Sequence, residues 1–288
     1  MLKQRVITAI ILLAILLPAL FYRTPLPFFV VTLVMIAAAG WEWGRLNACS
    51  QAVSVLLASC CVLFCGLSWY GGLLEKRMPL LWTAAGAAWV LGGAWLLRRG
   101  VPGWPRIPKA LRLIGGVAAL WLAWLALAQA RVIGIDFLLS VLLLVWVADI
   151  FAYIAGRTVG GRFSKSKLAP AISPGKSWEG AWGGMAGVVV LAFAWAVVDG
   201  RLADPGGAEI PGTSLYSQLW VQHGAVVMLV AVVFLAAMSV VGDLVESLIK
   251  RSAGAKDSSR LLPGHGGVLD RIDALLPTLP LALMLISF

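Results

Sequence analysis

Long apolar runs separated by short polar segments dominate this chain from one end to the other. A helix needs about 20 mostly apolar residues to cross the hydrocarbon core of a bilayer. Runs of that length predict nine transmembrane helices, at roughly 6–22, 27–43, 53–73, 79–97, 111–130, 135–156, 180–199, 221–249 and 272–288. The first run follows Lys3 and Arg5 as in a signal peptide, but it lacks an obvious small-x-small cleavage site, so we interpret it as a retained helix. The pattern predicts an all-α, polytopic membrane protein with one domain over residues 1–288.

Composition supports this class and narrows the possible partners. The chain has 288 residues, of which 61% are hydrophobic and 12% charged, and its mean hydropathy is +0.93. Soluble domains are nearer half apolar and a quarter charged, so a soluble protein is excluded. The net charge of +10 does not indicate nucleic-acid binding, because no basic face with stacking aromatic residues is present. Most of the 23 Lys and Arg fall in alternate connections, which places the N-terminus and those connections in the cytoplasm.

Two of the cytoplasmic connections hold an unusual concentration of charge. The first runs from Asp149 to Glu179, and the second runs from Gly242 to Asp273, so that the motif-bearing part is 149–273. Cations and carboxylates that alternate in this way suit phosphate groups and metal ions together. The sequence therefore predicts a site for phosphoryl or nucleotidyl chemistry on a lipid, at the membrane boundary.

One face of the eighth predicted helix carries polar residues at positions i, i+3, i+4 and i+7, namely Asp243, Glu246, Ser247 and Lys250. Carboxylates in a membrane helix are costly and are usually functional or paired. An ion pair of Lys250 with one of these two acids is the structural alternative. Asp270 and Asp273 follow one turn apart, which gives more acids than one lysine neutralises. Such converging carboxylates are what a Mg²⁺-dependent transfer to or from phosphates requires.

Glycine-rich segments complete the pattern. The turn 263–267 (Pro-Gly-His-Gly-Gly) allows backbone amides to approach an anion, and His265 is either a phosphate donor or a turn residue. Gly175-Lys176-Ser177 imitates the end of a P-loop, but Pro170 stands where the loop requires glycine. Two G-x-x-x-G pairs, at 180/184 and 183/187, favour close helix packing, within the chain or between subunits.

The stretch 247–273 resembles the signature of the phosphatidate cytidylyltransferase family, which reads S-x-x-K-R, K-D, P-x-H-G-G and D-R-x-D. All elements are present, as Ser247, Lys250, Arg251, Lys256, Asp257, Pro263, His265, Gly266, Gly267, Asp270, Arg271 and Asp273. Upstream segments are similar to the family too: Gly242-Asp243 with Glu246, Asp149-x-x-Ala-Tyr-x-x-Gly-Arg157, and Lys167-Leu-Ala-Pro170 through Trp178-Glu-Gly180. Ile150 departs from the small polar residue expected there. The motifs cover about the last half of the chain.

This resemblance implies transfer of a cytidylyl group from CTP to phosphatidate, giving CDP-diacylglycerol and pyrophosphate. It implies Mg²⁺, with or without a second cation, a homodimer, and a bacterial inner membrane with the site facing the cytoplasm. The expected catalytic residues are Asp243, Lys250, Asp270 and Asp273, with Asp243 and Asp270 as metal ligands. The expected substrate-binding residues are Arg157, Lys167, Ser173, Lys176, Glu246, Ser247, Arg251, Lys256, Asp257, His265, Gly266, Gly267 and Arg271.

Two other functions fit parts of the pattern. A CTP-dependent polyprenol kinase would move the γ-phosphoryl group to an alcohol and would need a base for the hydroxyl. A transporter would place its charges near mid-bilayer in broken helices, whereas here they gather at one face.

Overall fold

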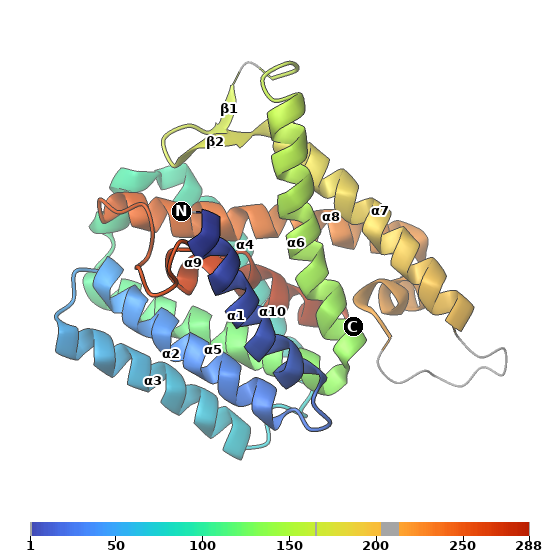
Figure 1. Cartoon of the computed structure of the whole chain (residues 1–288), viewed down its shortest axis with the longest axis horizontal. Helices are drawn as coiled ribbons and strands as arrows, with labels where there is room; N and C mark the ends of the chain where they lie inside the picture. Colours follow the sequence, from blue (N-terminus) through green and yellow to red (C-terminus); the bar gives the residue numbers. More distant parts are fainter. Residues whose placement is uncertain (1, 165, 203–212, 288) are drawn as a thin grey trace.

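The computed structural model describes residues 2–164, 166–202 and 213–287 (Figure 1). Its elements in chain order are α1 (Leu2–Phe21), α2 (Leu26–Leu46), α3 (Gln51–Tyr70), α4 (Pro79–Arg99), the 3-10 helix η1 (Val101–Arg106), α5 (Lys109–Ile133), α6 (Ile135–Thr158), β1 (Lys167–Ala169), β2 (Ser173–Ser177), α7 (Trp178–Leu202), α8 (Leu215–Ser252), α9 (Leu269–Ile272) and α10 (Leu275–Leu285). The two short strands are the whole of the sheet among these residues. The predicted all-α class is confirmed.

Eight of the described helices, α1 to α8, are long and apolar enough to cross a membrane, where nine were predicted. The ninth predicted span, 272–288, is replaced by the four-residue α9 and the 11-residue α10. An 11-residue helix is too short for a bilayer that requires about 20 residues. Its apolar sequence has a different use, because every residue from Leu276 to Leu283 is buried inside the protein.

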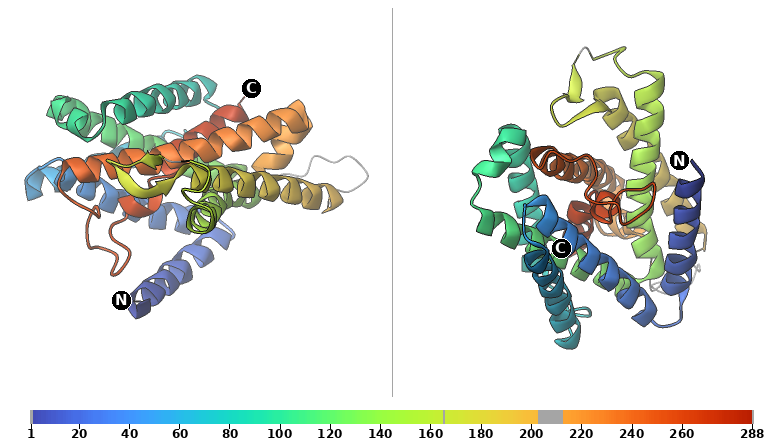
Figure 2. Two further views of the ribbon diagram at one scale, coloured as in Figure 1. Left: turned by 90° about the horizontal axis from the view of Figure 1, so that it is seen from above. Right: turned by 60° about the vertical axis from the view of Figure 1, so that its left-hand side comes forward.

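The short helix α10 lies at the centre of the molecule, where α4, α5, α6 and α8 all pack against it. By contrast α1 lies at the outside and projects away from the other helices (Figure 2). Its apolar residues, among them Ile7, Ile10 and Ile11, are exposed in the isolated chain, as expected of a helix that faces lipid. Thr8 of α1 donates a hydrogen bond to the carbonyl of Pro263 at 2.9 Å, which ties this helix to the predicted anion-binding turn.

Helices α6 and α7 pack closely along their length, through the glycines that the sequence singled out. A Cβ atom at Gly183 would lie 2.3 Å from the Cβ of Ala155, and one at Gly187 would lie 2.4 Å from the ring of Phe151. The predicted close packing is confirmed, and these contacts lie within one chain.

Helix α8 is longer than predicted, because it begins at Leu215 and not near residue 221. The hydroxyl of Ser214 accepts a hydrogen bond from the backbone N–H of Ser217 and so caps its first turn. Gly224 has a φ of 84°, which interrupts the helix with a kink that glycine tolerates. The long segment after the kink carries the predicted polar face to the membrane boundary.

Part of the first predicted cytoplasmic connection, between α6 and α7, forms an antiparallel hairpin of β1 and β2. Lys167 pairs with Ser177, and Ala169 pairs with Ser173. The hairpin stands beyond the ends of α6 and α7 (Figure 1). It therefore carries Lys176 to the side of α8.

Candidate active site

The predicted polar face of α8 is present, and its acids have cationic partners from two different segments. Asp243 forms an ion pair with Lys176 of β2, and it accepts a hydrogen bond of 3.1 Å from the hydroxyl of Ser247. The side chains of Lys176 and Asp243 keep 26% and 29% of their surface exposed, so this pair is open to a ligand.

One turn further along α8, the Lys250 cluster consists of Glu246, Lys250 and Asp270. The ammonium of Lys250 lies 2.5 Å from Glu246 Oε2 and 2.5 Å from Asp270 Oδ1. The contact with Glu246 is one of charge, because among the described residues neither carboxylate oxygen of Glu246 has a hydrogen-bond partner. The predicted structural alternative, a Glu246–Lys250 pair, is thus present, and it extends to a second acid on α9.

Asp270 is held by the loop that joins α8 to α9, residues 253–268. Its Oδ2 accepts hydrogen bonds from the Ser258 N–H at 2.9 Å, the Ser258 hydroxyl at 2.8 Å and the Gly267 N–H at 2.7 Å. Burial raises the pKa of this carboxyl, but the hydrogen bonds from Lys250 and from these amides lower it by more. The pKa of Asp270 is therefore below its ordinary value, and the group is ionised at neutral pH.

A second group of acids, Asp149, Asp243 and Asp273, lies close enough together for their charges to interact. Burial and the charges of Asp243 and Asp149 together raise the pKa of Asp273 to about 7, while the charge of Lys250 opposes them. Asp149 comes from α6, and the charges of Lys176 and Arg271 also act on it. These three acids and the cations Lys176, Lys250 and Arg271 form a mixed group of charges beside α6 and α8.

Glu42 of α2 is a site residue that the sequence analysis missed. It is fully buried and accepts hydrogen bonds from the hydroxyls of Ser258 and Ser259 and from the N–H groups of Val268 and Leu269, at 2.5–3.2 Å. It fixes both ends of the segment that presents Asp270. The signal was available, because Glu42 is a lone acid within an apolar run, and such acids are rarely without a function or a partner.

The turn 263–267 approaches an anion as predicted, but the anion in the described contacts is the Asp270 carboxylate. Gly264 and Gly266 have φ values of 77° and 83°, which favour glycine. A Cβ at Gly267 would lie 2.1 Å from the Ser258 hydroxyl and 2.3 Å from Glu42, so any side chain there would break the loop apart. His265 Nδ1 is buried without a hydrogen-bond partner among the described residues, and neither of its two predicted roles is decided.

Four of the predicted substrate-binding residues line two hollows. One, of about 380 Å³, lies between α6, β2 and α7 and brings together Asp149, Arg157 and Lys176. The other, of about 600 Å³, brings Lys256 and Asp257 together with Arg45 and Arg260. Arg251 donates to the carbonyls of Ile172 and Ala255, which connects the hairpin loop to the end of α8. Lys167 and Ser173 lie on the hairpin strands, and Arg271 is exposed on α9.

The donor chemistry of the site suits Mg²⁺, since carboxylates are its preferred protein ligands. No cluster of three or more acidic, His or Cys side chains able to enclose a metal occurs among the residues that the structure describes. Mg²⁺ usually takes one or two carboxylates and completes its shell with water and substrate phosphates. In the described contacts each of the two predicted metal ligands forms an ion pair, Asp243 with Lys176 and Asp270 with Lys250. The binding of one metal ion by both acids therefore stays a prediction.

Comparison with known proteins agrees with this geometry. The model of the cytidylyltransferase family matches residues 3–288. A phosphatidate cytidylyltransferase of Haemophilus influenzae is 37% identical over 303 residues, which cover 97% of this chain and 96% of the relative. A phosphatidate cytidylyltransferase of Pseudomonas aeruginosa is 34% identical, with 97% and 95% covered, and one of Brucella abortus is 36% identical, with 95% and 89% covered. Because the match extends over almost the whole chain, including the Asp149–Glu179 and Gly242–Asp273 connections, the chain belongs to the cytidylyltransferase family.

Proposed function

We propose that this protein transfers the cytidylyl group of CTP to phosphatidate, giving CDP-diacylglycerol and pyrophosphate. Family membership and the names of its full-length relatives support this activity. The observation that carries it is the meeting of Asp243 on α8 with Lys176 of the hairpin, beside a hollow that Asp149 and Arg157 also line. Cations that bind phosphates and acids that can hold a metal thus share one partly exposed site, on helices that cross a bilayer.

The chemistry requires no dedicated base. The second pKa of a phosphomonoester lies near 6, so the phosphatidate phosphate already carries a nucleophilic oxygen at neutral pH. That oxygen bonds to the α-phosphorus of CTP while the bond from this phosphorus to the pyrophosphate oxygen breaks, with the two oxygens in line. Lys176 and Arg157 would bind phosphate groups, and their charge would offset the negative charge brought together as the two substrates meet.

Mg²⁺ belongs to the proposal as the divalent ion, with or without a second cation. Asp243 and Asp270 are the proposed ligands, with Asp273 and Glu246 as alternates, and the ion would neutralise phosphate charge and align the reacting groups. Chelation with EDTA should abolish turnover, and added Mg²⁺ should restore it. Asp243→Ala and Asp270→Ala should each lose roughly a hundredfold in turnover. Wild-type turnover by both variants would contradict the ligand assignment.

Orientation and assembly are proposed as well. The distribution of Lys and Arg supports a cytoplasmic N-terminus and active site in a bacterial inner membrane. The homodimer rests on the family resemblance alone. The homodimer is checked by measuring the mass of the protein in detergent by light scattering. A monomer with full activity would contradict the proposed assembly.

The reaction itself is tested with CTP labelled at different phosphates. Purified protein is incubated with phosphatidate, Mg²⁺ and CTP that carries ³²P at either the α- or the γ-position. We expect label from the α-position to enter the lipid and label from the γ-position to leave as pyrophosphate. The polyprenol kinase alternative predicts the reverse, with γ-label on an added polyprenol. Transfer of γ-label to a lipid alcohol would overturn the proposal.

A further inference from the structure

The loop that leaves α6, residues 159–164, exposes a large aromatic side chain. Phe163 keeps 84% of its surface exposed, more than any other phenylalanine among the described residues. It does not belong to a spanning helix, where exposure to lipid would be ordinary, because α6 ends at Thr158. A single exposed ring is common on protein surfaces, so the surroundings of Phe163 decide what it indicates.

The backbone of this loop is fixed although the ring is exposed. Oε1 of Glu179 accepts hydrogen bonds from the N–H of Phe163 at 3.1 Å and from the N–H of Ser164 at 2.7 Å. Glu179 itself is buried. The N–H of Arg162 donates to the carbonyl of Val159 at 3.1 Å, which closes a turn just before the ring. The fold therefore holds Phe163 at a defined position with its ring at the surface.

The residue that fixes the loop also places it at the membrane boundary. Glu179 lies in the first turn of α7, and the residues Trp178 and Trp182 on either side of it keep 41% and 62% of their surface exposed. Tryptophans at the ends of transmembrane helices lie at the level of the lipid headgroups, and α7 is one of the described helices able to cross a membrane. Since Phe163 is hydrogen-bonded to this turn, the loop lies at the same level, at the outer edge of the molecule (Figure 1).

Exposed cations lie on both sides of the ring along the chain. Arg162 directly precedes Phe163, and Lys167 begins β1. Ion pairs with acids within the described part of the chain involve Lys176 and Lys250 alone, so neither of these two cations is neutralised there. An aromatic ring between exposed cations complements a bilayer surface with anionic headgroups, because the ring enters the interface while the cations attract the lipid phosphates.

We propose that the loop 159–164 anchors the hairpin end of α6 and α7 to the membrane surface. Phe163 inserts at the boundary between the headgroups and the acyl chains, and Arg162 and Lys167 bind anionic headgroups such as that of phosphatidylglycerol. The partner is the anionic surface of the bilayer itself. The anchor goes beyond the proposed reaction and does not depend on it.

The anchor has a consequence for the hairpin that carries Lys176. β2 is continuous with α7, and β1 follows the loop directly, so the hairpin is held at its two ends by the helix and by the loop. A loop fixed to the membrane surface restricts the motion of β1, and through the pairing of the two strands it restricts β2 as well. Lys176 is thereby kept beside Asp243 of α8.

Depth in the membrane is measured with a fluorophore in place of the ring. In the full chain without its four native cysteines, Phe163→Cys is labelled with the fluorophore NBD and reconstituted into vesicles that contain a lipid with a spin-label quencher high in its acyl chain. We expect severalfold stronger quenching of this label than of the same label at Lys256→Cys, an exposed position of the other charged connection. Equal quenching at the two positions, or quenching of the Phe163→Cys label by aqueous iodide, would overturn insertion and would indicate a water-soluble partner.

The choice of headgroup is tested in the same assay. Vesicles of phosphatidylcholine alone are compared with vesicles of equal parts phosphatidylcholine and phosphatidylglycerol. Quenching of the Phe163→Cys label should rise with phosphatidylglycerol, and Arg162→Gln should remove most of that rise. Arg106→Gln, at an exposed cation of the connection between α4 and α5, is the matched control and should keep it. Quenching that does not depend on phosphatidylglycerol would refute the binding of anionic headgroups.

Hydrogen exchange of the backbone amides measures the consequence for the hairpin. In vesicles with phosphatidylglycerol, Phe163→Ala should speed exchange over residues 167–177 severalfold, whereas Phe163→Leu, which keeps an apolar side chain, should exchange as the wild type does. Leu261→Ala, at an exposed apolar residue of the loop between α8 and α9, should leave the hairpin unchanged. Exchange in Phe163→Ala equal to that of the wild type would refute the anchoring of the hairpin.

The anchor and the proposed reaction fail in different ways. An inserted label at Phe163→Cys together with no transfer from CTP by the wild type would support the anchor and refute the reaction. A label in water together with normal transfer by the wild type would refute the anchor and leave the reaction supported.

Discussion

At the scale of single residues, Glu42 connects the second transmembrane helix to the loop that presents Asp270. Four donors point at its carboxylate from Ser258, Ser259, Val268 and Leu269. Their convergence stabilises the negative charge of Glu42 inside the protein, and a neutral amide of the same shape cannot replace it, because its NH₂ group would face donors.

Glu42→Gln should therefore destabilise the protein by about 2–3 kcal/mol, the usual worth of hydrogen bonds to a charged group. Turnover should fall as well, because the loop would no longer hold Asp270 in place. Thermal unfolding in detergent, followed by tryptophan fluorescence, measures the first effect. Glu75→Gln, at an exposed position, is the matched control. An unfolding temperature equal to that of the wild type would contradict this role.

Lys250 is the second residue whose charge stabilises buried acids. It forms ion pairs with both Glu246 and Asp270, whose side chains are each 5% exposed. Lys250→Met would leave two acids near each other without a cation, and we expect a loss of about 3–5 kcal/mol in the free energy of unfolding.

The double variant Lys250→Met/Glu246→Gln should recover part of that loss, because it removes one of the two stranded charges. The free energy of unfolding is measured by denaturation for the wild type, for Lys250→Met, for Glu246→Gln and for the double variant. These four values give the coupling energy of the pair. Additive effects would show that Glu246 and Lys250 do not interact.

At the scale of elements, the contact between α6 and α7 depends on glycine. Gly183 lies against Ala155 and Gly187 lies against Phe151, so the two helices approach more closely than larger residues would allow. α6 carries Asp149 and Arg157, and α7 follows the hairpin that carries Lys176, so their spacing sets the width of the hollow between them.

Gly183→Val should separate the two helices, with a loss of about 1–3 kcal/mol, as for other overpacked positions. Gly200→Val on the same helix is the control, because a Cβ at Gly200 meets open space. Turnover and unfolding temperature should both fall for the first variant and stay unchanged for the second. Equal behaviour of the two variants would show that the close approach is unimportant.

At the scale of the whole molecule, four of the eight spanning helices, α4, α5, α6 and α8, pack around the short α10, and the charged connections lie toward the proposed cytoplasmic side. The orientation can be measured on the intact protein. In a variant without its four native cysteines, Lys256→Cys should react with a membrane-impermeant maleimide only in inside-out vesicles. Arg77→Cys, in the connection between α3 and α4, should react only in right-side-out vesicles. The opposite pattern would reverse the topology.

The sequence by itself determined the class of the protein, the positions of most helices and the polar face of α8. These features are local, since the length of an apolar run and the 3.6-residue period act within one segment. The signature identified the family because its residues lie within 27 positions of one another, from Ser247 to Asp273.

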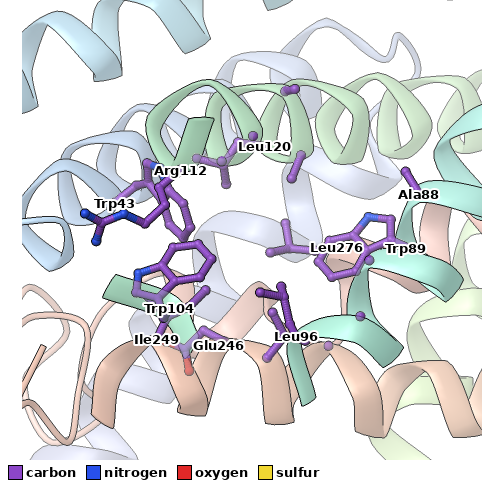
Figure 3. Close-up of a pocket in the computed structure, with 18 of the residues that line it drawn as sticks. Trp43, Ala88, Trp89, Leu96, Trp104, Arg112, Leu120, Glu246, Ile249 and Leu276 are labelled. Carbon is purple, nitrogen blue, oxygen red and sulfur yellow. The ribbon is translucent and has the colours of Figure 1, made fainter. Parts of the chain in front are cut away.

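Only the tertiary structure decided which acid meets which cation. Lys176 reaches Asp243 and Glu42 reaches Ser259 across long stretches of chain, and no periodicity links such positions. The same holds for α10, whose apolar sequence suits lipid and protein interior equally, so that its length in the folded chain excluded it as a span. An apolar cavity of about 420 Å³ (Figure 3) also depends on the fold, because its walls come from α2, α4, η1, α5, α8 and α10. Local sequence determines where helices form and which faces of them are apolar or polar. The packing of distant segments decides which side chains meet.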